Sequence, residues 1–319
     1  MNGEVKKTEK LDISILIPLY NEEENLEPLF EKIEEAISRL GLRWEAVFVD
    51  DGSTDGSLSR LKKIKSTSTR GRIISLRRNF GKSAALDAGF KKIRARRIVI
   101  MDADLQDDPE EIPQLLRELD SGFDLVSGWR TRRRDRFIKK YTSRIFNLVT
   151  SALSGIKLHD FNCGLKAMER EVAENISLYG ELHRYIPVLA YWKGFRVAET
   201  PVRHHPRGAG QSKFGVYRFF AGFMDILTVM FLTRYSKKPL HLFGGAGLVL
   251  FTAGVLINAY LVMLSILGID YIRSRPLLFL GILLILIGFQ LISIGLLGEM
   301  LAMSLHRKKG EDIVRSIES

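Results

Sequence analysis

Short apolar runs alternate with amphipathic stretches along the first part of the chain. The apolar runs are rich in β-branched residues, which is typical of strands buried on both faces. They cover residues 13–19, 44–49, 72–76, 98–101 and 123–127. The stretches between them have helical periodicity and cover residues 24–40, 56–65, 83–94 and 112–121. Strands that alternate with helices through short connections predict a mostly parallel, doubly wound α/β sheet.

The last third of the chain has a different pattern. Residues 243–267 and 277–300 are almost wholly apolar, and each stretch exceeds the roughly 20 residues that a helix needs to cross a bilayer. The short connection between them predicts a transmembrane helical hairpin. Residues 214–235 are aromatic and apolar but interrupted by charges, which predicts one or two helices lying in the membrane interface.

These patterns divide the chain into four expected parts. We expect a soluble domain, an interfacial segment, the hairpin and a basic tail, with the boundaries 1–213, 214–241, 242–305 and 306–319. The N-terminus is polar and carries no apolar signal segment, which favours a cytosolic first domain. Basic residues on both flanks of the hairpin place its ends on the cytoplasmic side, although Arg273 and Arg275 between the helices weaken this count.

Glycines recur every seven residues in the two apolar stretches. Gly281, Gly288 and Gly295 share one spacing, and so do Gly247 and Gly254. Small residues on one stripe let helices approach closely, either within the hairpin or between protomers. A homo-oligomer formed through the transmembrane helices is therefore one of two expectations.

Four carboxylates follow the strand at 98–101. They cannot enter the core unpaired, so the chain must reach the surface here, at the carboxyl end of the strand. These residues are Asp102, Asp104, Asp107 and Asp108. One interpretation is a set of hard oxygen ligands for Mg²⁺ or Mn²⁺, completed by substrate phosphates. The other is an acidic turn that begins the next helix, and this suits Asp107 and Asp108 better than metal binding does.

Charge and motifs exclude several classes of protein. The net charge of +11 is compatible with nucleic acid, a membrane surface or phosphate-bearing substrates. No RNA-binding or helix-turn-helix signature accompanies it, so we expect no nucleic acid. The glycine patterns of dinucleotide-binding dehydrogenases and P-loop NTPases are absent. Lys82 therefore either meets a phosphate outside a P-loop or is a solvated charge, and the single cysteine, Cys163, excludes an internal disulfide.

Two basic segments have two interpretations each. Residues 130–144 are dense in cations, and form either a solvated face or a membrane-facing surface with arginines turned to a specific phosphate. Residues 207–213 are glycine-rich and basic, as in a loop that closes over phosphates or in a linker between domains. His204 and His205 are adjacent in an extended segment, so we interpret them as loop histidines rather than metal ligands.

Taken together, the motifs resemble family 2 glycosyltransferases with the GT-A fold. The likeness rests on residues 17–22, 49–55 and 102–106. A narrower likeness to polyprenyl-phosphate glycosyltransferases, such as dolichol-phosphate mannose synthase and undecaprenyl-phosphate glucosyltransferase, rests on residues 79–82, 127–130, 160–164 and 212–213 and on the hairpin. The Q-x-x-R-W motif of processive polysaccharide synthases is absent, which favours transfer of a single sugar.

The resemblance implies roles for particular residues. The nucleotide sugar would be held by Pro18, Tyr20, Glu22, Asp51, Lys82 and Asp102. The divalent cation, Mg²⁺ or Mn²⁺, would be held by Asp102, Asp104 and Gln106. The acceptor phosphate would be held by Arg130, Arg144 and Lys213, which with Asp104 and Asp160 would form the catalytic set.

The resemblance also implies an activity. We expect an inverting glycosyltransferase that moves one sugar from a nucleotide sugar, UDP-glucose first, to a polyprenyl phosphate such as undecaprenyl phosphate. The reaction would take place at the cytoplasmic face of the inner membrane, with both termini in the cytosol. The alternatives are another donor (GDP-mannose or a UDP-linked modified arabinose), another lipid acceptor, and a non-catalytic scaffold that binds a nucleotide sugar or lipid.

Overall fold

The computed structural model describes residues 11–131, 147, 150–151, 154–205, 239–268 and 276–307. The chain divides into two compact units, Met1–Ile226 and Leu227–Ser319. Most of the expected interfacial segment 214–241 lies outside the described residues, so it stays a prediction.

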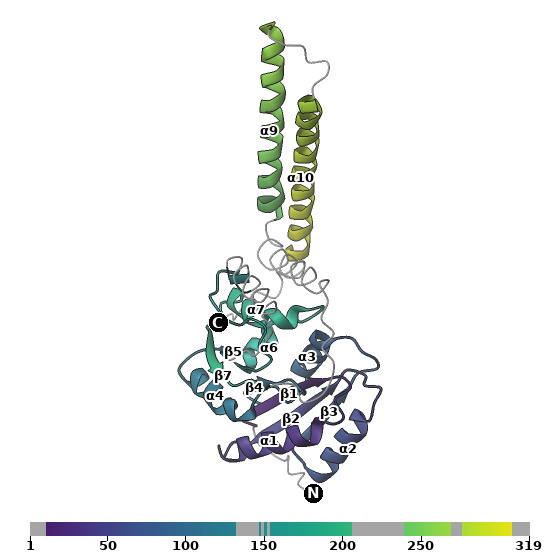
Figure 1. Ribbon diagram of the computed structural model, residues 1–319, viewed down its shortest axis with the longest axis vertical. Coiled ribbons are helices and arrows are strands. Elements are labelled where there is room, and N and C mark those ends of the chain that lie inside the picture. Colours follow the sequence, from purple (N-terminus) through teal and green to yellow (C-terminus); the bar gives the residue numbers. More distant parts are fainter. Residues whose placement is uncertain are drawn as a thin grey trace, which may run out of the picture. The chain divides into compact units, whose positions relative to one another are not determined.

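The first unit is built on one seven-stranded sheet with the order β3-β2-β1-β4-β6-β5-β7 (Figure 1). The strands are β1 (Ile13–Leu19), β2 (Trp44–Asp50), β3 (Gly71–Ser75), β4 (Arg97–Ile100), β5 (Leu125–Arg130), β6 (Lys166–Glu169) and β7 (Val197–Val202). All neighbouring pairs are parallel except those of β6, which runs antiparallel to both β4 and β5. The expected mostly parallel α/β sheet is confirmed.

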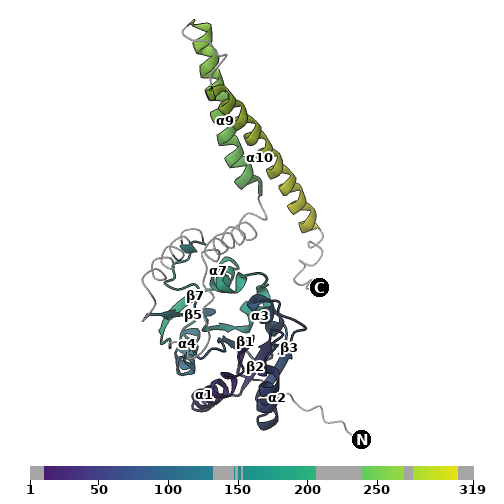
Figure 2. The same ribbon diagram turned by 45° about the vertical axis from the view of Figure 1, so that its right-hand side comes forward.

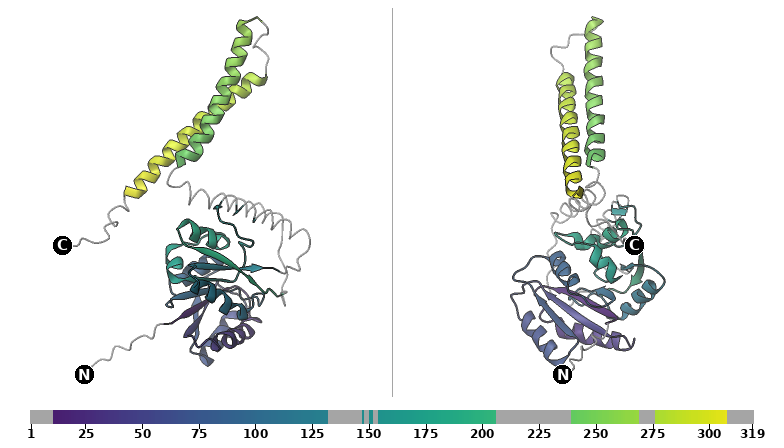
Figure 3. Two further views of the ribbon diagram at one scale, coloured as in Figure 1. Left: turned by 90° about the vertical axis from the view of Figure 1, so that its left-hand side faces the viewer. Right: turned by 180° about the vertical axis from the view of Figure 1, so that it is seen from behind.

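Helices cover both faces of this sheet (Figures 2 and 3). They are α1 (Leu26–Ser38), α2 (Ser57–Thr67), α3 (Lys82–Phe90), η1 (Pro109–Glu111), α4 (Ile112–Asp120), α6 (Arg170–Asn175), η2 (Leu182–Tyr185) and α7 (Ile186–Trp192). Every residue of β1 is buried, and its successive side chains point to opposite faces. Ile15 belongs to the core cluster shared with α1 and α4, whereas Leu16 faces α3.

The approach of α3 to the sheet depends on a glycine. A Cβ added at Gly89 would lie 2.4 Å from Cδ1 of Leu16, which is closer than any real contact of this kind. The backbone of α3 at Gly89 therefore packs directly on the side chain of Leu16 in β1. The helix begins at Lys82, beside the carboxyl ends of the strands.

Two strands of the second half of the sheet, β6 and β7, were not expected from the sequence. β6 is only four residues long and starts and ends with a charged residue. β7 contains Pro201, and its apolar and polar residues alternate only weakly. Neither sequence has the continuous apolar run by which β1, β2 and β4 can be recognised. Both strands form because the neighbouring strands offer them unpaired backbone groups, which a sequence pattern does not reveal.

The second unit contains α9 (Pro239–Ile266) and α10 (Pro276–Arg307), which run side by side in Figures 1 to 3. Both helices are long and apolar enough to cross a membrane, as expected. Many of their large apolar side chains are exposed; Leu256 and Phe289 have exposed fractions of 64% and 63%. Such a surface is stable when lipid rather than water covers it.

The glycine stripes lie between the two helices. A Cβ at Gly247 would be 2.6 Å from the carbonyl oxygen of Gly288, and one at Gly254 would be 2.6 Å from that of Gly281. The stripes therefore serve close packing within the hairpin, which is one of the two expectations that the sequence left open. An oligomer through these helices stays a prediction.

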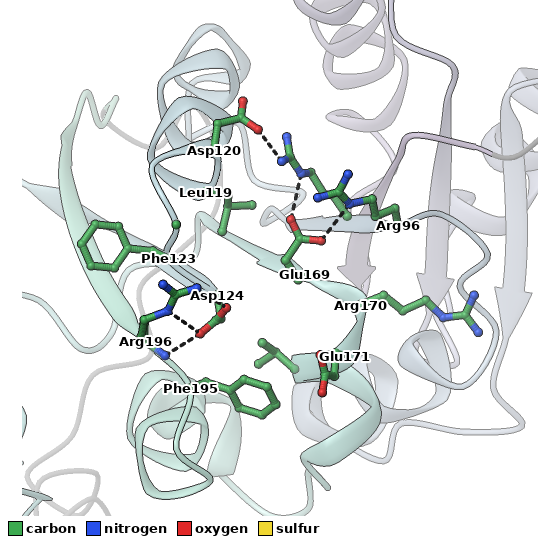
Figure 4. Close-up of a pocket in the computed structure, with 13 residues that line it drawn as sticks. Arg96, Leu119, Asp120, Phe123, Asp124, Glu169, Arg170, Glu171, Phe195 and Arg196 are labelled. Carbon is green, nitrogen blue, oxygen red and sulfur yellow. Dashed lines mark hydrogen bonds and ion pairs between the residues drawn. The ribbon is translucent and has the colours of Figure 1, made fainter.

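The edge of the sheet where the parallel strands begin is closed by ion pairs around a cavity of about 590 Å³ (Figure 4). Arg97 contacts Glu169 at 3.0 Å and also pairs with Asp120. Asp124 accepts hydrogen bonds from the backbone nitrogen of Arg196 at 2.7 Å and from its guanidinium at 3.3 Å. These pairs join the starts of β4, β5 and β7, so we interpret this edge as structural.

We expect Asp124→Asn to lower the free energy of unfolding by about 1 kcal/mol at neutral pH, because the hydrogen bonds to a charged acceptor are weakened. Burial by itself would raise the pKa of Asp124, but the hydrogen bonds from Arg196 outweigh it and the pKa is lowered. A lowered carboxyl pKa stabilises the fold above the unfolded value of about 3.9, and this contribution is lost as the pH falls through the folded value.

The difference between the variant and the unsubstituted protein should therefore shrink in acid, as measured by thermal unfolding of the full-length protein in detergent between neutral and acidic pH. Glu171→Gln is the control, since Glu171 lines the same cavity, is exposed and has no ion pair among the described residues. A difference that stays constant down to strongly acidic pH would contradict the role given to Asp124.

We expect Gly254→Val to destabilise the hairpin by about 1–3 kcal/mol, because the added side chain meets the backbone of α10. Gly245→Val is matched to it, since Gly245 lies in the same helix and has no atom within 4 Å of an added Cβ. Denaturation of the full-length protein in mixed micelles should separate the two variants. Equal stability would show that the helices are not in contact at Gly254.

Candidate active site

The polar clusters of the sequence meet at the carboxyl ends of β1, β2, β4 and β5. Two cavities of about 260 and 290 Å³ lie there. The lining of the first includes Pro18, Tyr20, Glu22, Asp51, Asn79 and Gly81. The lining of the second includes Gln106, Asp107, Arg130, Asn162, His183 and Arg184. Lys82, Asp102 and Asp104 line both cavities, so these three residues connect them.

Asp51 shapes one wall of the first cavity. Its side chain is buried, and its two oxygens accept hydrogen bonds from the backbone nitrogens of Phe80 and Gly81, each at 2.8 Å. Gly52 has a φ of +71°, and a Cβ there would lie 2.4 Å from the backbone of Arg78. The loop after β2 and the loop before α3 are thus fixed to each other. The sequence assigned Asp51 to the nucleotide; in the structure both of its oxygens hold the neighbouring loop.

A tight turn after β1 presents Tyr20 and Glu22. Asn21 adopts a φ of +56°, and its side chain accepts a hydrogen bond from the backbone of Thr54 at 2.8 Å. Its own backbone nitrogen donates to the hydroxyl of Ser53 at 3.0 Å. This turn leaves 42% of Tyr20 exposed at the rim of the first cavity. Tyr20 is therefore free to stack on a planar ligand.

Asp102 is paired with a lysine. Its carboxylate contacts Nζ of Lys82, the first residue of α3. Partial burial would raise the pKa of Asp102, but the Lys82 ammonium lowers it overall, so the carboxylate is ionised. Lys166 of β6 adds a second positive group nearby; it is buried, its Nζ donates to the carbonyl oxygen of Cys163, and burial lowers its pKa.

The loop from Asp104 to Gln106 has an unusual backbone. Leu105 has a φ of +58°, a conformation that costs a residue with a branched side chain about 1 kcal/mol or more. The backbone nitrogen of Gln106 donates to Oδ1 of Asp104 at 3.2 Å. The side chains of Asp102, Asp104 and Gln106 offer carboxylate and amide oxygens as metal ligands, and the amide nitrogen of Gln106 is their one other polar atom. The donor set is therefore one that a hard divalent cation prefers.

The interpretation of Asp107 as a helix-start residue is wrong, whereas that of Asp108 is confirmed. Asp108 accepts a hydrogen bond from the backbone of Glu110 at 3.1 Å and caps η1. Asp107 instead turns inward, is buried and lies 3.5 Å from Nδ1 of His204. It can do so because a Cβ at Gly164 would be 2.6 Å from Asp107 and 2.7 Å from Asp102.

Arg130 and Asp160, which the sequence assigned to separate roles, form one unit. The guanidinium binds the carboxylate through Nε at 2.7 Å and Nη2 at 3.0 Å, and Nη2 also donates to the carbonyl oxygen of Asn162 at 3.1 Å. Asp160 is 1% exposed. Burial would lower the pKa of Arg130, but Asp160 raises it above its usual range.

The neighbouring thiol is inert. Cys163 is buried beneath Gly128, where a Cβ would lie 2.8 Å from its Sγ. Burial raises the pKa of the thiol to about 12, so it stays protonated at physiological pH. Cys163 therefore contributes packing rather than chemistry.

His183 and Arg184 were missed by the sequence analysis. They come from η2, far from the recognised motifs, and both line the second cavity. Burial, Lys82 and Arg184 lower the pKa of His183 to about 2, so its ring is neutral. The only sequence signal is a histidine and an arginine before a short proline-containing apolar helix, which by itself is weak. Arg144 and Lys213 lie outside the described residues, and their roles stay predictions.

Comparison with known proteins supplies the family. The model of the family described as "Glycosyl transferase family 2" matches residues 14–177 of this chain. "Dodecaprenyl-phosphate galacturonate synthase" of Rhizobium johnstonii is 39% identical over 325 residues, covering 99% of this chain and 96% of that protein. "Undecaprenyl-phosphate 4-deoxy-4-formamido-L-arabinose transferase" of Salmonella paratyphi B is 35% identical over 290 residues, covering 90% of this chain and 87% of that protein.

Solved structures agree on the fold. Glucosyl-3-phosphoglycerate synthase from Mycobacterium tuberculosis, in complex with Mn²⁺, UDP-glucose and phosphoglyceric acid, superposes with a TM-score of 0.51. The match covers 70% of this chain and 79% of that one at 19% identity, so it shows a common GT-A fold. From the family match and the relatives that span nearly its whole length, the chain belongs to glycosyl transferase family 2, where it groups with the polyprenyl-phosphate glycosyltransferases.

Proposed function

We propose that this enzyme transfers one sugar from a nucleotide sugar to a polyprenyl phosphate at the cytoplasmic face of the membrane. The observation that carries the proposal is that Lys82, Asp102 and Asp104 line both cavities. A nucleotide in the first cavity would bring its diphosphate to these residues, and the sugar would then extend into the second. The relatives, whose names specify dodecaprenyl and undecaprenyl phosphate, support the acceptor class.

The donor that we propose is a UDP-linked sugar. UDP-glucose was the expectation from the sequence, but the relatives are named for galacturonate and for a formamido-arabinose. The relative at 39% identity matches 99% of this chain. UDP-galacturonic acid is therefore the first donor to test, followed by UDP-linked formamido-arabinose and UDP-glucose.

The proposed cation site consists of the carboxylates of Asp102 and Asp104 and the amide oxygen of Gln106. The donor set fits Mg²⁺ or Mn²⁺, since both prefer carboxylate and carbonyl oxygens. When bound, the cation would stabilise negative charge on the leaving diphosphate. Lys82, which pairs with Asp102, adds a fixed positive charge at the same point.

The acceptor needs little help from a base. A phosphate monoester has a second pKa of about 6 and is mostly ionised at neutral pH. What the reaction requires is positive charge that brings two anions together. We propose that Asp160 holds Arg130 in position for the acceptor phosphate, since Nε and Nη2 are occupied by Asp160 and Asn162 and Nη1 has no partner among the described residues.

The proposed course of the reaction is a single in-line displacement. The acceptor phosphate oxygen bonds to the anomeric carbon as the bond to the nucleoside diphosphate breaks, so the anomeric configuration inverts. Arg144 and Lys213 are proposed to join Arg130 at the acceptor phosphate. The hairpin of α9 and α10, with both ends proposed on the cytosolic side, would keep the enzyme at the membrane where the lipid acceptor lies.

The proposal is tested with the purified full-length protein in detergent, undecaprenyl phosphate, Mg²⁺ or Mn²⁺ and a panel of labelled donors. The panel holds UDP-galacturonic acid, UDP-4-deoxy-4-formamido-L-arabinose, UDP-glucose and GDP-mannose. We expect labelled lipid from one of the UDP sugars. Labelled lipid only with a different lipid acceptor, or from no donor at all, would overturn the proposal, and the second result would favour the scaffold alternative.

We expect Asp104→Asn to retain the fold and to lose at least 100-fold in kcat, because an amide is a weaker ligand for a hard cation and leaves the diphosphate charge less stabilised. Mn²⁺ binding, followed by electron paramagnetic resonance, should weaken in parallel. Glu110→Gln is the control, since it alters an exposed carboxylate on the neighbouring η1. Unchanged activity of Asp104→Asn across a range of metal concentrations would exclude Asp104 as a ligand.

A further inference from the structure

The start of α3 is bound to η2 by a serine and a histidine that are 100 positions apart. Oγ of Ser83 accepts a hydrogen bond from the backbone nitrogen of His183 at 3.0 Å, and it lies 2.9 Å from Nδ1 of the same residue. Ser83 is 1% exposed, so water does not compete for its hydroxyl group. The two contacts fix both the backbone and the ring of His183.

The network assigns the proton on the ring. Because Ser83 already accepts from the backbone of His183, its hydroxyl hydrogen needs an acceptor, and Nδ1 is the one within reach among the described residues. Nδ1 therefore carries the lone pair. In a neutral imidazole the proton then lies on Nε2.

The surroundings keep the ring neutral. Lys82 of α3, Arg184 of η2 and Lys166 of β6 are the positive groups that act on it, and Asp102 is the opposing negative one. A positive charge on the ring itself would be repelled by these three groups. His183 is therefore a hydrogen-bond donor without charge, and its Nε2 has no hydrogen-bond partner in the described part of the chain.

We propose that the Nε2–H of His183 donates a hydrogen bond to an oxygen of the donor sugar, with Ser83 as its positioning residue. This inference rests on the proposed function. The ring lines the second cavity, which also contains Asp104 at its diphosphate end and Arg130 at its proposed acceptor end. The transferred sugar has to occupy the space between these two groups.

Two other roles fit the arrangement less well. A metal ligand needs a lone pair on the nitrogen that faces the metal, and Nε2 carries a proton here. The diphosphate already has Lys82 and the proposed cation site, and a neutral N–H adds less to an anion than a charged group does. A hydroxyl or carboxylate oxygen of the sugar is the remaining acceptor in the cavity.

The test compares three variants of the full-length enzyme with the UDP sugar that gives turnover. His183→Ala should lower kcat/KM for the donor about tenfold, since one hydrogen bond is lost, and should leave competitive inhibition by UDP unchanged within about twofold. His183→Gln should recover most of the loss, because its amide N–H can reach the position of Nε2–H. Ser83→Ala should give a smaller loss of about threefold, because the ring can then change tautomer.

Each alternative gives a different result. Equal weakening of UDP and of the UDP sugar by His183→Ala would place the contact on the diphosphate and overturn the proposal. An equal loss of kcat/KM in His183→Ala and His183→Gln, with a lower melting temperature in both, would show that the contact between Ser83 and His183 is only structural and would overturn the proposal. The tautomer is read independently by nitrogen NMR of histidine-labelled enzyme, assigned by comparison with His183→Gln, and a proton on Nδ1 would also overturn the proposal.

These outcomes are distinct from failure of the proposed function. If no donor of the panel is turned over by the unsubstituted enzyme, the proposed function fails before any variant is made. If turnover is observed, the three variants test His183 alone.

Discussion

Compensation of charge at the strand ends is the constraint on which the arrangement of this enzyme depends. Asp107 and Asp160 are buried, and so is Lys166, while Asp102 is only partly exposed to the cavities. Buried charges persist only where opposite charges or hydrogen bonds reach them. The partners come from different parts of the chain, so each ion pair also fixes the position of one element against another.

The antiparallel strand β6 illustrates this dependence. By running between β4 and β5 in the reverse direction, it begins at the edge where β4 and β5 end, and so brings Lys166 to the site. The loop before it carries Asp160 and Gly164. If β6 ran parallel to its neighbours, Lys166 at its start would lie at the opposite edge of the sheet. The carboxylates of the loop after β4 would then lack this buried lysine beside them.

The sequence was informative where one physical signal dominated. Continuous apolar runs predicted β1 with its observed bounds, and long apolar segments predicted α9 and α10. The motif residues Asp102 and Asp104, which the sequence places directly after β4, line both cavities. In each of these cases the signal lies within a few neighbouring residues or one helix, so it does not depend on what the rest of the chain does.

The sequence was uninformative where the outcome depends on distant residues. The inward turn of Asp107 requires the missing side chain of Gly164, and the neutral state of His183 depends on burial and on Lys82. The strand β6 requires free edges on both of its neighbours. None of these relations leaves a local pattern, because each involves groups that are separated by tens of residues and meet only in the folded protein.

The burial of the one cysteine has a practical consequence for work on this enzyme. A protonated thiol beneath Gly128 does not react with alkylating or disulfide-forming reagents at neutral pH, because the thiolate is the nucleophile. The natural chain is thus already a silent background for site-directed labelling. A cysteine introduced at an exposed position would be the sole reactive thiol, so spin labels or fluorophores could follow residues 130–144, residues 207–213 and the hairpin in lipid without replacement of Cys163.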